Sequence, residues 1–347
     1  MADFLTLPQE EADLPKLGVV IPAWFSPELP PAQVRELLLH TLAGSQRLAP
    51  PERLVLVVDG APAVSAVAHE LQTDWTRDLG APFVLLDLPE NGGKGAAVAA
   101  GLQYLCAAEP PAYCLTRDAD GDHRVSDMPR LVLLAEQIAR EQDTGLVAVI
   151  GGRQSVHRPM NWLRGELELW LDEVATEAYK LALAQTGAAL NTQYYAAYGS
   201  YADLESGCKC FSAAAARLAA ETLRSEAAKH PELDLLRWAC EILPLTEVVL
   251  AGGVIGEVRR LTYEGQPASG YEGPQSIPLY ANQLIWLAQR LALTRRQAAQ
   301  LLDNALLRRG MWSDGEARAI ALDIRARVLA PLSGPDAPTE IHVPRFC

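Results

Sequence analysis

The chain has 347 residues, of which 49% are hydrophobic and 21% are charged, and its formal net charge at pH 7 is −13. This is the composition of a globular protein with a substantial core. The acidic balance argues against nucleic acid and anionic membrane surfaces as partners, because both are bound through clustered Lys and Arg.

The sequence predicts a soluble, cytoplasmic protein without an integral membrane segment. The N-terminus lacks the charged-then-apolar layout of a signal segment, and the most apolar stretch, 242–258, is interrupted by Pro244, Glu247 and Glu257. Cysteines stand at positions 106, 114, 208, 210, 240 and 347 without CxxC spacing. We therefore expect reduced thiols, mostly in the core, rather than a zinc site or a disulfide framework.

The first 90 residues predict strands that alternate with helices. Continuous apolar runs at 17–22, 54–58 and 83–86 are typical of strands buried on both faces, and the apolar positions of 33–48 and 64–79 have helical spacing. Such alternation predicts right-handed βαβ units, and hence an α/β fold with a mostly parallel sheet. Ligands of such sheets bind outside the carboxyl ends of the strands.

A glycine-rich turn, ENGGKG at 90–95, opens the next predicted helix. Peptide N–H groups at a helix start attract anionic oxygens, and Lys94 adds a cation in the first turn. The turn therefore predicts a diphosphate cradle, although a glycine pair before a helix is as often only a tight turn.

A short strand follows that helix and leads into three aspartates at every second position, Asp118, Asp120 and Asp122. They share one face if the strand stays extended, and Gly121 lets the backbone turn. Such oxygen ligands suit Mg²⁺ or Mn²⁺, completed by water and substrate phosphate. The spacing does not fit an EF-hand loop. Three alternating acids are by themselves more often a solvated turn, and it is their combination with the glycine turn that favours a metal and diphosphate site.

Polar features follow several of the predicted strands. Pro22, Asp59, the turn at 91–95 and Asp118 all come just after a strand end, so we expect them to converge on one edge of the sheet. A dinucleotide-binding fold would need GxGxxG after the first strand, where this chain has PAWFSP.

The second half of the chain predicts further helices and strands and then a change of texture. We expect a helix at 131–142, a strand at 146–150, a long helix at 162–190, a tyrosine-rich loop at 191–211, helices at 211–225 and 233–243, and a strand pair at 248–261 broken by Gly252 and Gly253. A turn-rich linker and a largely helical stretch at 277–330 follow, with an irregular tail. We therefore divide the chain into a domain at 1–262 and a linker plus helical appendage at 263–347.

Several motifs keep a common order along the chain. They are LGVVIPAWF (17–25), LVLVVDGA (54–61), LPENGGKGAAVAAGL (88–102), RDADGDH (117–123), GGR (151–153) and DLESGCKCF (203–211), with weaker echoes in LDLLRWA (233–239) and IGEVRRLTYEGQP (255–267). In this order the chain resembles family 2 glycosyltransferases, in particular the branch of dolichyl-phosphate mannose synthases and dolichyl-phosphate glucosyltransferases. The resemblance implies the GT-A fold, a Rossmann-like, mostly parallel mixed sheet flanked by helices.

The resemblance also implies a function. It implies transfer of a sugar from a nucleoside diphosphate donor, with inversion at the anomeric carbon and with Mg²⁺ or Mn²⁺ as cofactor. The residues that it assigns to nucleotide-sugar binding are Pro22, Ala23, Asp59, Asn91, Gly93, Lys94, Asp118 and Arg153. Those that it assigns to the metal are Asp118, Asp120 and Asp122. Metal and fixed cations would stabilise the negative charge of the departing nucleoside diphosphate.

Three departures from the family bear on the substrates. WFSPE stands where the family has an Asn-Glu pair, Asp122 replaces a common Gln, and many lipid-phosphate relatives carry membrane anchors that this chain lacks. We therefore expect a soluble hydroxyl acceptor, which needs a general base, and Asp203 and Glu205 are the candidates. Loop capping and contact with Lys209 explain these acids equally well.

The tyrosines at 194, 195, 198 and 201 are interpreted as the wall of a polar acceptor pocket, although core packing explains any one of them better. The acids of the long helix at 162–190 are expected to repel an anionic bilayer.

Three alternatives stay open. They are a polyprenyl-phosphate glycosyltransferase, a sugar-phosphate nucleotidyltransferase, which would need a Gly-rich, Arg-containing loop after the first strand, and a non-catalytic nucleotide-sugar-binding module. The sequence does not determine the donor base, the sugar, the acceptor or whether the chain forms a homo-oligomer.

Overall fold

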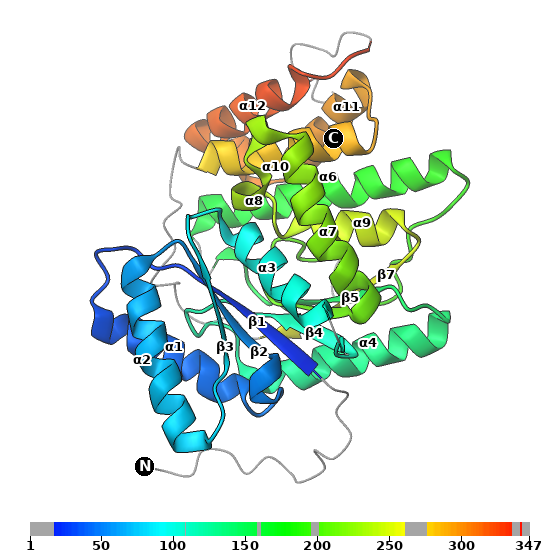
Figure 1. Ribbon diagram of the computed structural model, residues 1–347. Helices are drawn as coiled ribbons and strands as arrows, with labels where there is room; N and C mark the ends of the chain where they lie inside the picture. The colour runs from blue at the N-terminus through cyan, green and yellow to red at the C-terminus, as the bar shows by residue number, and fades with distance from the viewer. Residues whose placement is uncertain are drawn as a thin grey trace.

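The computed structural model describes residues 17–107, 109–157, 161–195, 201–260, 276–334 and 341. Their strands form one seven-stranded sheet in the order β3-β2-β1-β4-β6-β5-β7 (Figure 1). The strands are β1 Leu17–Ala23, β2 Leu54–Asp59, β3 Val84–Leu88, β4 Tyr113–Thr116, β5 Val147–Arg153, β6 Lys209–Ser212 and β7 Val254–Arg260. Only β6 runs antiparallel to its neighbours among these strands. The predicted α/β class with a mostly parallel mixed sheet is therefore confirmed.

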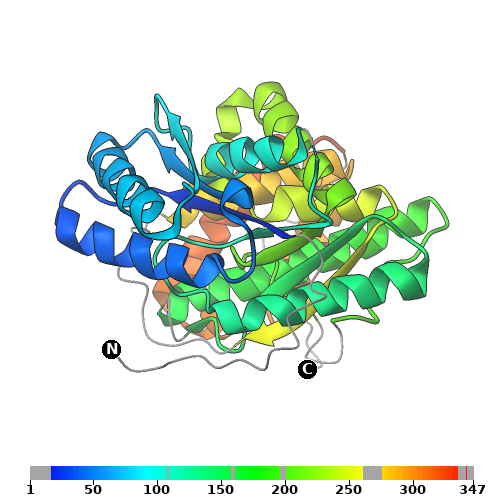
Figure 2. The ribbon, with the colours of Figure 1, turned by 60° about the horizontal axis from the view of Figure 1, so that its bottom comes forward.

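Helices cover both faces of the sheet. They are α1 Pro31–Ser45, α2 Pro62–Leu79, α3 Lys94–Cys106, α4 Met128–Gln142, α6 Trp162–Gln185, α7 Ala213–Lys229, α8 Leu235–Trp238, α9 Ile242–Leu250, α10 Ser276–Arg290, α11 Arg295–Leu306 and α12 Gly315–Leu329. Successive side chains of a strand point to opposite faces. Val19 and Ile21 of β1 accordingly pack with α1, α2 and α4, whereas Val20 packs with α3 and α7. Figure 2 shows α1 and α4 on one side of the sheet and α3 and α7 on the other.

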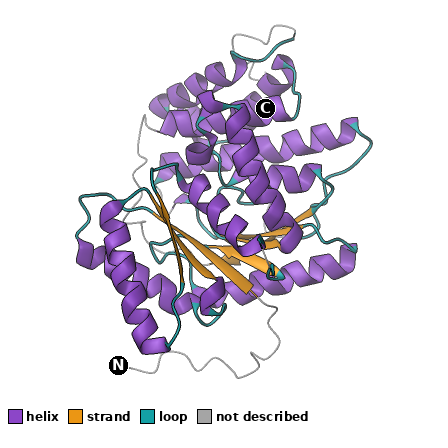
Figure 3. Ribbon diagram, in the orientation of Figure 1, coloured by secondary structure: helices purple, strands orange, loops and turns teal. Residues whose placement is uncertain are grey.

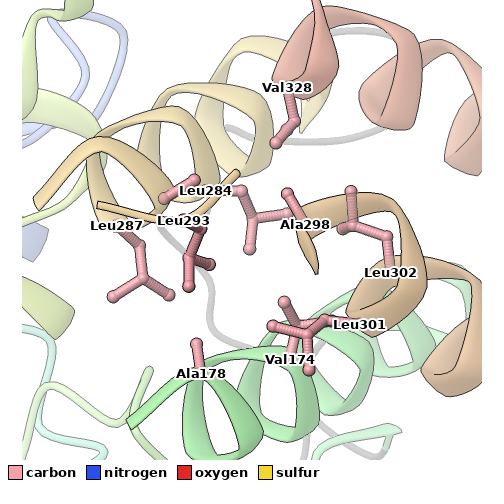
Figure 4. Close-up of a pocket in the computed structure, with 10 residues that line it drawn as sticks. Val174, Ala178, Leu284, Leu287, Leu293, Ala298, Leu301, Leu302 and Val328 are labelled. Carbon is pink, nitrogen blue, oxygen red and sulfur yellow. The ribbon is translucent and has the colours of Figure 1, made fainter. Parts of the chain in front are cut away.

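The C-terminal helices α10, α11 and α12 lie beyond the strands (Figure 3). Helices α10 and α11 pack against α6, and α12 packs against α10 and α11. Val174 and Ala178 of α6 meet Leu284, Leu302 and Val328 in an apolar layer (Figure 4). The indole of Trp170 donates a hydrogen bond to the carbonyl of Leu302, at 3.0 Å. The predicted helical stretch is thus confirmed and shares a core with α6. Three predicted features fall outside the described residues. The domain boundary at 262 and most of the linker lie among residues 261–275, and most of the tail lies after residue 334.

The structure corrects one predicted strand and one predicted helix. The expected strand pair at 248–261 is a single strand, because Val248 to Leu250 end helix α9. Helix α9 is strongly apolar and mostly buried, and its nine residues are too few for length to distinguish a buried helix from a buried strand. The predicted helix at 233–243 is divided into α8 and the start of α9. Helix α7 begins at Ala213, where the Ser212 hydroxyl accepts from the Ala215 N–H, and Phe211 lies in β6.

The acids of α6, which were expected to repel an anionic bilayer, mostly do not face solvent. Glu166, Glu168, Asp172 and Glu173 are all buried. Partners on α6 and on other elements explain this, because burying an unpaired carboxylate is costly. Glu173 pairs with Arg308 and Arg309, and Glu168 pairs with arginines on β5 and α6. These four acids therefore give no reason to expect repulsion from a bilayer.

Four predicted core thiols, Cys114, Cys208, Cys210 and Cys240, are buried, Cys106 is half-buried, and Cys347 lies outside the described residues. In the part of the chain that the structure describes, none of the helices combines the length and the apolar character that crossing a bilayer requires.

Candidate functional site

A cavity of about 380 Å³ lies at the edge of the sheet where the parallel strands end. The chain leaves β1 towards β2 on one side and returns to β4 on the other, so this edge contains the topological switch point at which α/β proteins bind ligands. Of the twelve predicted site residues, ten line the cavity: Pro22, Ala23, Asp59, Asn91, Gly93, Lys94, Asp118, Asp120, Arg153 and Glu205. Asp122 and Asp203 do not line it.

Asp59, at the end of β2, holds the glycine turn. Its carboxylate accepts hydrogen bonds from the Gly92 N–H at 2.8 Å and the Gly93 N–H at 2.9 Å. Gly60 has φ +57°, and a Cβ there would lie 2.1 Å from the backbone nitrogen of Asn91. These two N–H groups were expected to face a diphosphate, and they are instead bonded to Asp59. Burial raises the pKa of Asp59, and the hydrogen bonds from the two N–H groups act in the opposite direction.

Lys94, the first residue of α3, is paired with two carboxylates. Its ammonium lies 2.7 Å from Asp118 Oδ1 and 2.8 Å from Glu241 Oε1. Burial opposes its charge, yet Asp118 and Glu241 raise the pKa of Lys94 well above its usual value. Lys94 therefore stays a cation in the cavity, and an arriving anion would compete with these two acids for it.

The three aspartates do not share one face, because β4 ends at Thr116 and the chain turns. Gly121 has φ +82°, as its predicted role in a turn requires. Asp120 Oδ1 accepts from the Asp122 N–H at 3.1 Å, and Asp122 pairs with Arg260 at 3.1 Å. Asp118 and Asp120 thus stay at the cavity, whereas Asp122 is directed to β7.

Charge at this turn favours a cation. Burial, followed by the Asp118 carboxylate, raises the pKa of Asp120 to about 6. Burial also acts to raise the pKa of Asp118, but Lys94 and other nearby cations hold it below its usual range. Among the described residues no group of three His, Cys, Asp or Glu side chains is arranged to hold a metal ion. A divalent ion at this turn would have Asp118 and Asp120 as its carboxylate ligands and would need water and substrate for the rest, as Mg²⁺ commonly does.

Arg153, at the end of β5, is enclosed by carboxylates. Its Nε donates to Asp203 Oδ2 at 2.9 Å, its Nη2 donates to Asp203 Oδ1 at 2.5 Å, and Nη2 lies 2.6 Å from Glu168 Oε2. The Arg153 and Asp203 side chains are only 2% and 3% exposed. Burial opposes the Asp203 charge, yet Arg153 holds the pKa of Asp203 below its usual value. Asp203 therefore orients Arg153 from behind the cavity wall, and a base role does not fit its position.

Glu205 is the other candidate base, and it does line the cavity. Gln283 Nε2 donates to Glu205 Oε2 at 3.0 Å. Burial, followed by the charges of Glu241 and Glu168, raises the pKa of Glu205 to about 8. A carboxyl group with such a pKa accepts a proton more readily than an ordinary glutamate does.

Several cavity residues were missed from sequence. They are Trp24, Phe25, Arg164, Glu168, Arg237, Cys240, Glu241 and Arg260. Arg237 and Arg260 lie in the two weaker motifs, which was a usable signal. Glu168 and Glu241 follow no recognisable pattern.

The expected tyrosine wall is not found. Tyr194, Tyr195 and Tyr201 do not line the cavity, and Tyr194 donates to Glu141 on α4 at 2.8 Å. Tyr198 lies outside the described residues.

No family model matches the chain. Over 121 residues the chain is 34% identical to undecaprenyl-phosphate 4-deoxy-4-formamido-L-arabinose transferase of Pseudomonas savastanoi pv. phaseolicola, which is 35% of this chain and 33% of that protein. The match thus spans about a third of the curated relative. It supports the resemblance to glycosyltransferases without distinguishing the family 2 branch.

Two solved structures are similar at low identity. One is TarS 1–349 of S. aureus, with 14% identity, a TM-score of 0.38 and coverage of 90% of each chain. The other is the mannosyltransferase PcManGT of Pyrobaculum calidifontis in complex with GDP-Man and Mn²⁺, with 13% identity, a TM-score of 0.40 and coverage of 92% of this chain and 74% of that one. Neither TM-score reaches 0.5, so neither establishes a shared fold.

Proposed function

We propose that the chain is an inverting glycosyltransferase that moves a sugar from a nucleoside diphosphate donor to a hydroxyl acceptor. The observation that carries the proposal is the convergence of Asp59, Lys94, Asp118 and Asp120 on one cavity at the switch point of the sheet. The cavity volume of about 380 Å³ lies in the range of small-molecule sites. The partial match to a sugar transferase supports the same reaction class.

The cavity residues have different roles towards the donor. Pro22, Ala23 and Asp59 form the end where the nucleoside binds, and Lys94 holds the diphosphate by charge-assisted hydrogen bonds. Asp118 and Asp120 would hold Mg²⁺ or Mn²⁺, which when bound supplies positive charge for the departing diphosphate. Arg153 adds positive charge at the far end and is itself oriented by Asp203.

Glu205 removes the proton of the acceptor hydroxyl. Burial raises the pKa of Glu205 to about 8, compared with about 6 for Asp120, and Glu205 Oε1 has no hydrogen-bond partner among the described residues. A second candidate function, transfer to a polyprenyl phosphate, is favoured by the name of the curated relative. A phosphate acceptor is already a nucleophile and needs no base.

The donor is tested by thermal shift with UDP-, GDP-, ADP- and dTDP-sugars, with and without Mn²⁺. A ligand that binds the native state at a hundred times its Kd stabilises the protein by about 2.7 kcal/mol. We expect one base to raise Tm, and Mn²⁺ to increase the rise. A Tm that no nucleotide sugar changes would contradict the proposal.

Asp120→Asn is expected to abolish the part of the donor shift that depends on Mn²⁺. The amide keeps the shape of the side chain but removes the charge that a divalent ion needs. The measurement is the difference in donor Kd with and without Mn²⁺. Asp323→Asn, at an exposed ion pair with Arg327 on α12, is the control. An undiminished Mn²⁺ effect in Asp120→Asn would remove Asp120 from the metal site.

Lys94→Ala is expected to weaken donor binding by about 1 to 3 kcal/mol, the scale of a charge-assisted hydrogen bond. Calorimetry with the donor identified above measures the change. Lys180→Ala is the control, because Lys180 pairs with Glu177 on α6, away from the cavity. Equal affinities for wild type and Lys94→Ala would leave Lys94 with a structural role only.

A further inference from the structure

One face of α10 reaches the acids at the far end of the cavity. Tyr280 and Gln283 are both 0% exposed, and residues three apart on a helix share a face. Gln283 Nε2 donates to Glu205 Oε2 at 3.0 Å, and the Tyr280 hydroxyl donates to Glu168 Oε1 at 3.4 Å. Helix α10 belongs to the C-terminal helices, so a segment far along the chain contacts two cavity residues (Figure 1).

Two oxygens of this contact are unpaired. Glu205 Oε1 and Gln283 Oε1 are buried, and neither has a hydrogen-bond partner among the described residues. Buried polar atoms in proteins are nearly always paired, so an unpaired one calls for an explanation. Because Gln283 donates to Oε2 of Glu205, Oε1 is the carboxylate oxygen that has no partner among the described residues.

The surroundings of Glu205 are crowded with titratable groups. The groups that interact electrostatically with Glu205 are Glu168, Asp172 and Tyr179 on α6, Lys209 on β6, Glu241 before α9 and Tyr280 on α10. Burial and the neighbouring acids favour the protonated form of Glu205, whereas the Gln283 N–H favours the carboxylate. The Gln283 amide therefore acts to lower the pKa of Glu205, whereas burial and the neighbouring acids raise it.

We propose that Gln283 is a positioning residue that orients Glu205 and stabilises its carboxylate form, which makes α10 part of the catalytic unit. The catalytic consequence rests on the proposed function, in which Glu205 is the base. The contact between the two side chains does not depend on it.

Gln283→Met tests the contact, because methionine has a similar shape and no N–H donor. The ¹³C signal of the Glu205 carboxyl, assigned by its loss in Glu205→Gln, is titrated in the full chain without substrate. Losing one hydrogen bond is expected to raise the pKa of Glu205 by roughly half a unit to one unit. Gln283→Glu places a second acid there and is expected to raise it further. Gln289→Leu, at an exposed position of α10, is the control and should leave the titration unchanged.

The second readout is the pH profile of kcat. Its acid limb is expected to move to higher pH in Gln283→Met by the same amount as the NMR titration, with little change in donor KM. An unchanged Glu205 titration in both folded variants would overturn the proposal. A shifted titration with an unmoved kcat limb would support the contact and overturn the base role of Glu205, so the two failures are distinguishable.

Discussion

Glu205→Gln is expected to lower kcat on a hydroxyl acceptor by about 10²- to 10⁴-fold, the usual contribution of a general base. Glutamine keeps the shape of the side chain and cannot take the proton. Donor affinity is expected to stay close to the wild-type value, because the diphosphate is held by Lys94 and the aspartates. Steady-state kinetics and donor calorimetry separate the two effects.

The pH dependence follows from the same residue. Burial raises the pKa of Glu205 to about 8, and only the carboxylate form acts as base, so kcat is expected to rise with pH up to about 8 and then level off. Glu316→Gln, on the exposed side of α12, is the control. If Glu205→Gln turned over at the wild-type rate, Glu205 would not be the general base. If that rate were observed on a polyprenyl phosphate, it would favour the second candidate function.

Arg153→Met is expected to destabilise the fold by about 3 to 5 kcal/mol, the typical effect of removing one partner of a buried ion pair. In wild type, Arg153 Nη2 lies 2.5 Å from Asp203 Oδ1 and 2.6 Å from Glu168 Oε2. The variant leaves both carboxylates buried next to an apolar side chain. Urea unfolding measures the change through the midpoint and the m-value. The control is Arg327→Met, whose ion pair with Asp323 is exposed and is expected to contribute less than about 1 kcal/mol.

The effect of Arg153→Met is expected to shrink at acidic pH. In wild type the pKa of Asp203 is held below its unfolded value, so the pair stabilises the fold above that value and loses its contribution as pH falls. In the variant the buried Asp203 can be neutralised by a proton, and the cost of this falls with pH and becomes small below about pH 4, where Asp203 is also increasingly protonated in the unfolded chain. A loss of stability below 1 kcal/mol at pH 7 would show that Arg153 is not held as the contacts indicate.

Most elements were predictable because their signals are local. The apolar runs of β1 and β2 and the helical period of α4 depend on neighbours in sequence, and each was predicted to within a few residues. Helix α9 was not, because a short, mostly buried apolar run cannot be told from a strand by its residue pattern. The division of 233–243 into two helices was also not predicted, since the chain leaves the helical conformation at Ala239, φ −138° and ψ 16°, which its residue type does not require.

Position at the cavity was likewise determined by the sequence. Pro22 and Asp59 lie at the ends of β1 and β2, and Asp118 follows β4. Because the carboxyl ends of parallel strands meet at one edge, a strand pattern is sufficient to bring them together. The tertiary structure alone decided what these side chains contact. Asp59 bonds the glycine turn, Lys94 meets Glu241, and Gln283 meets Glu205. These pairings join segments that are distant in sequence, and they depend on how α3, the segment before α9 and α10 lie relative to one another, which no local pattern of residues specifies.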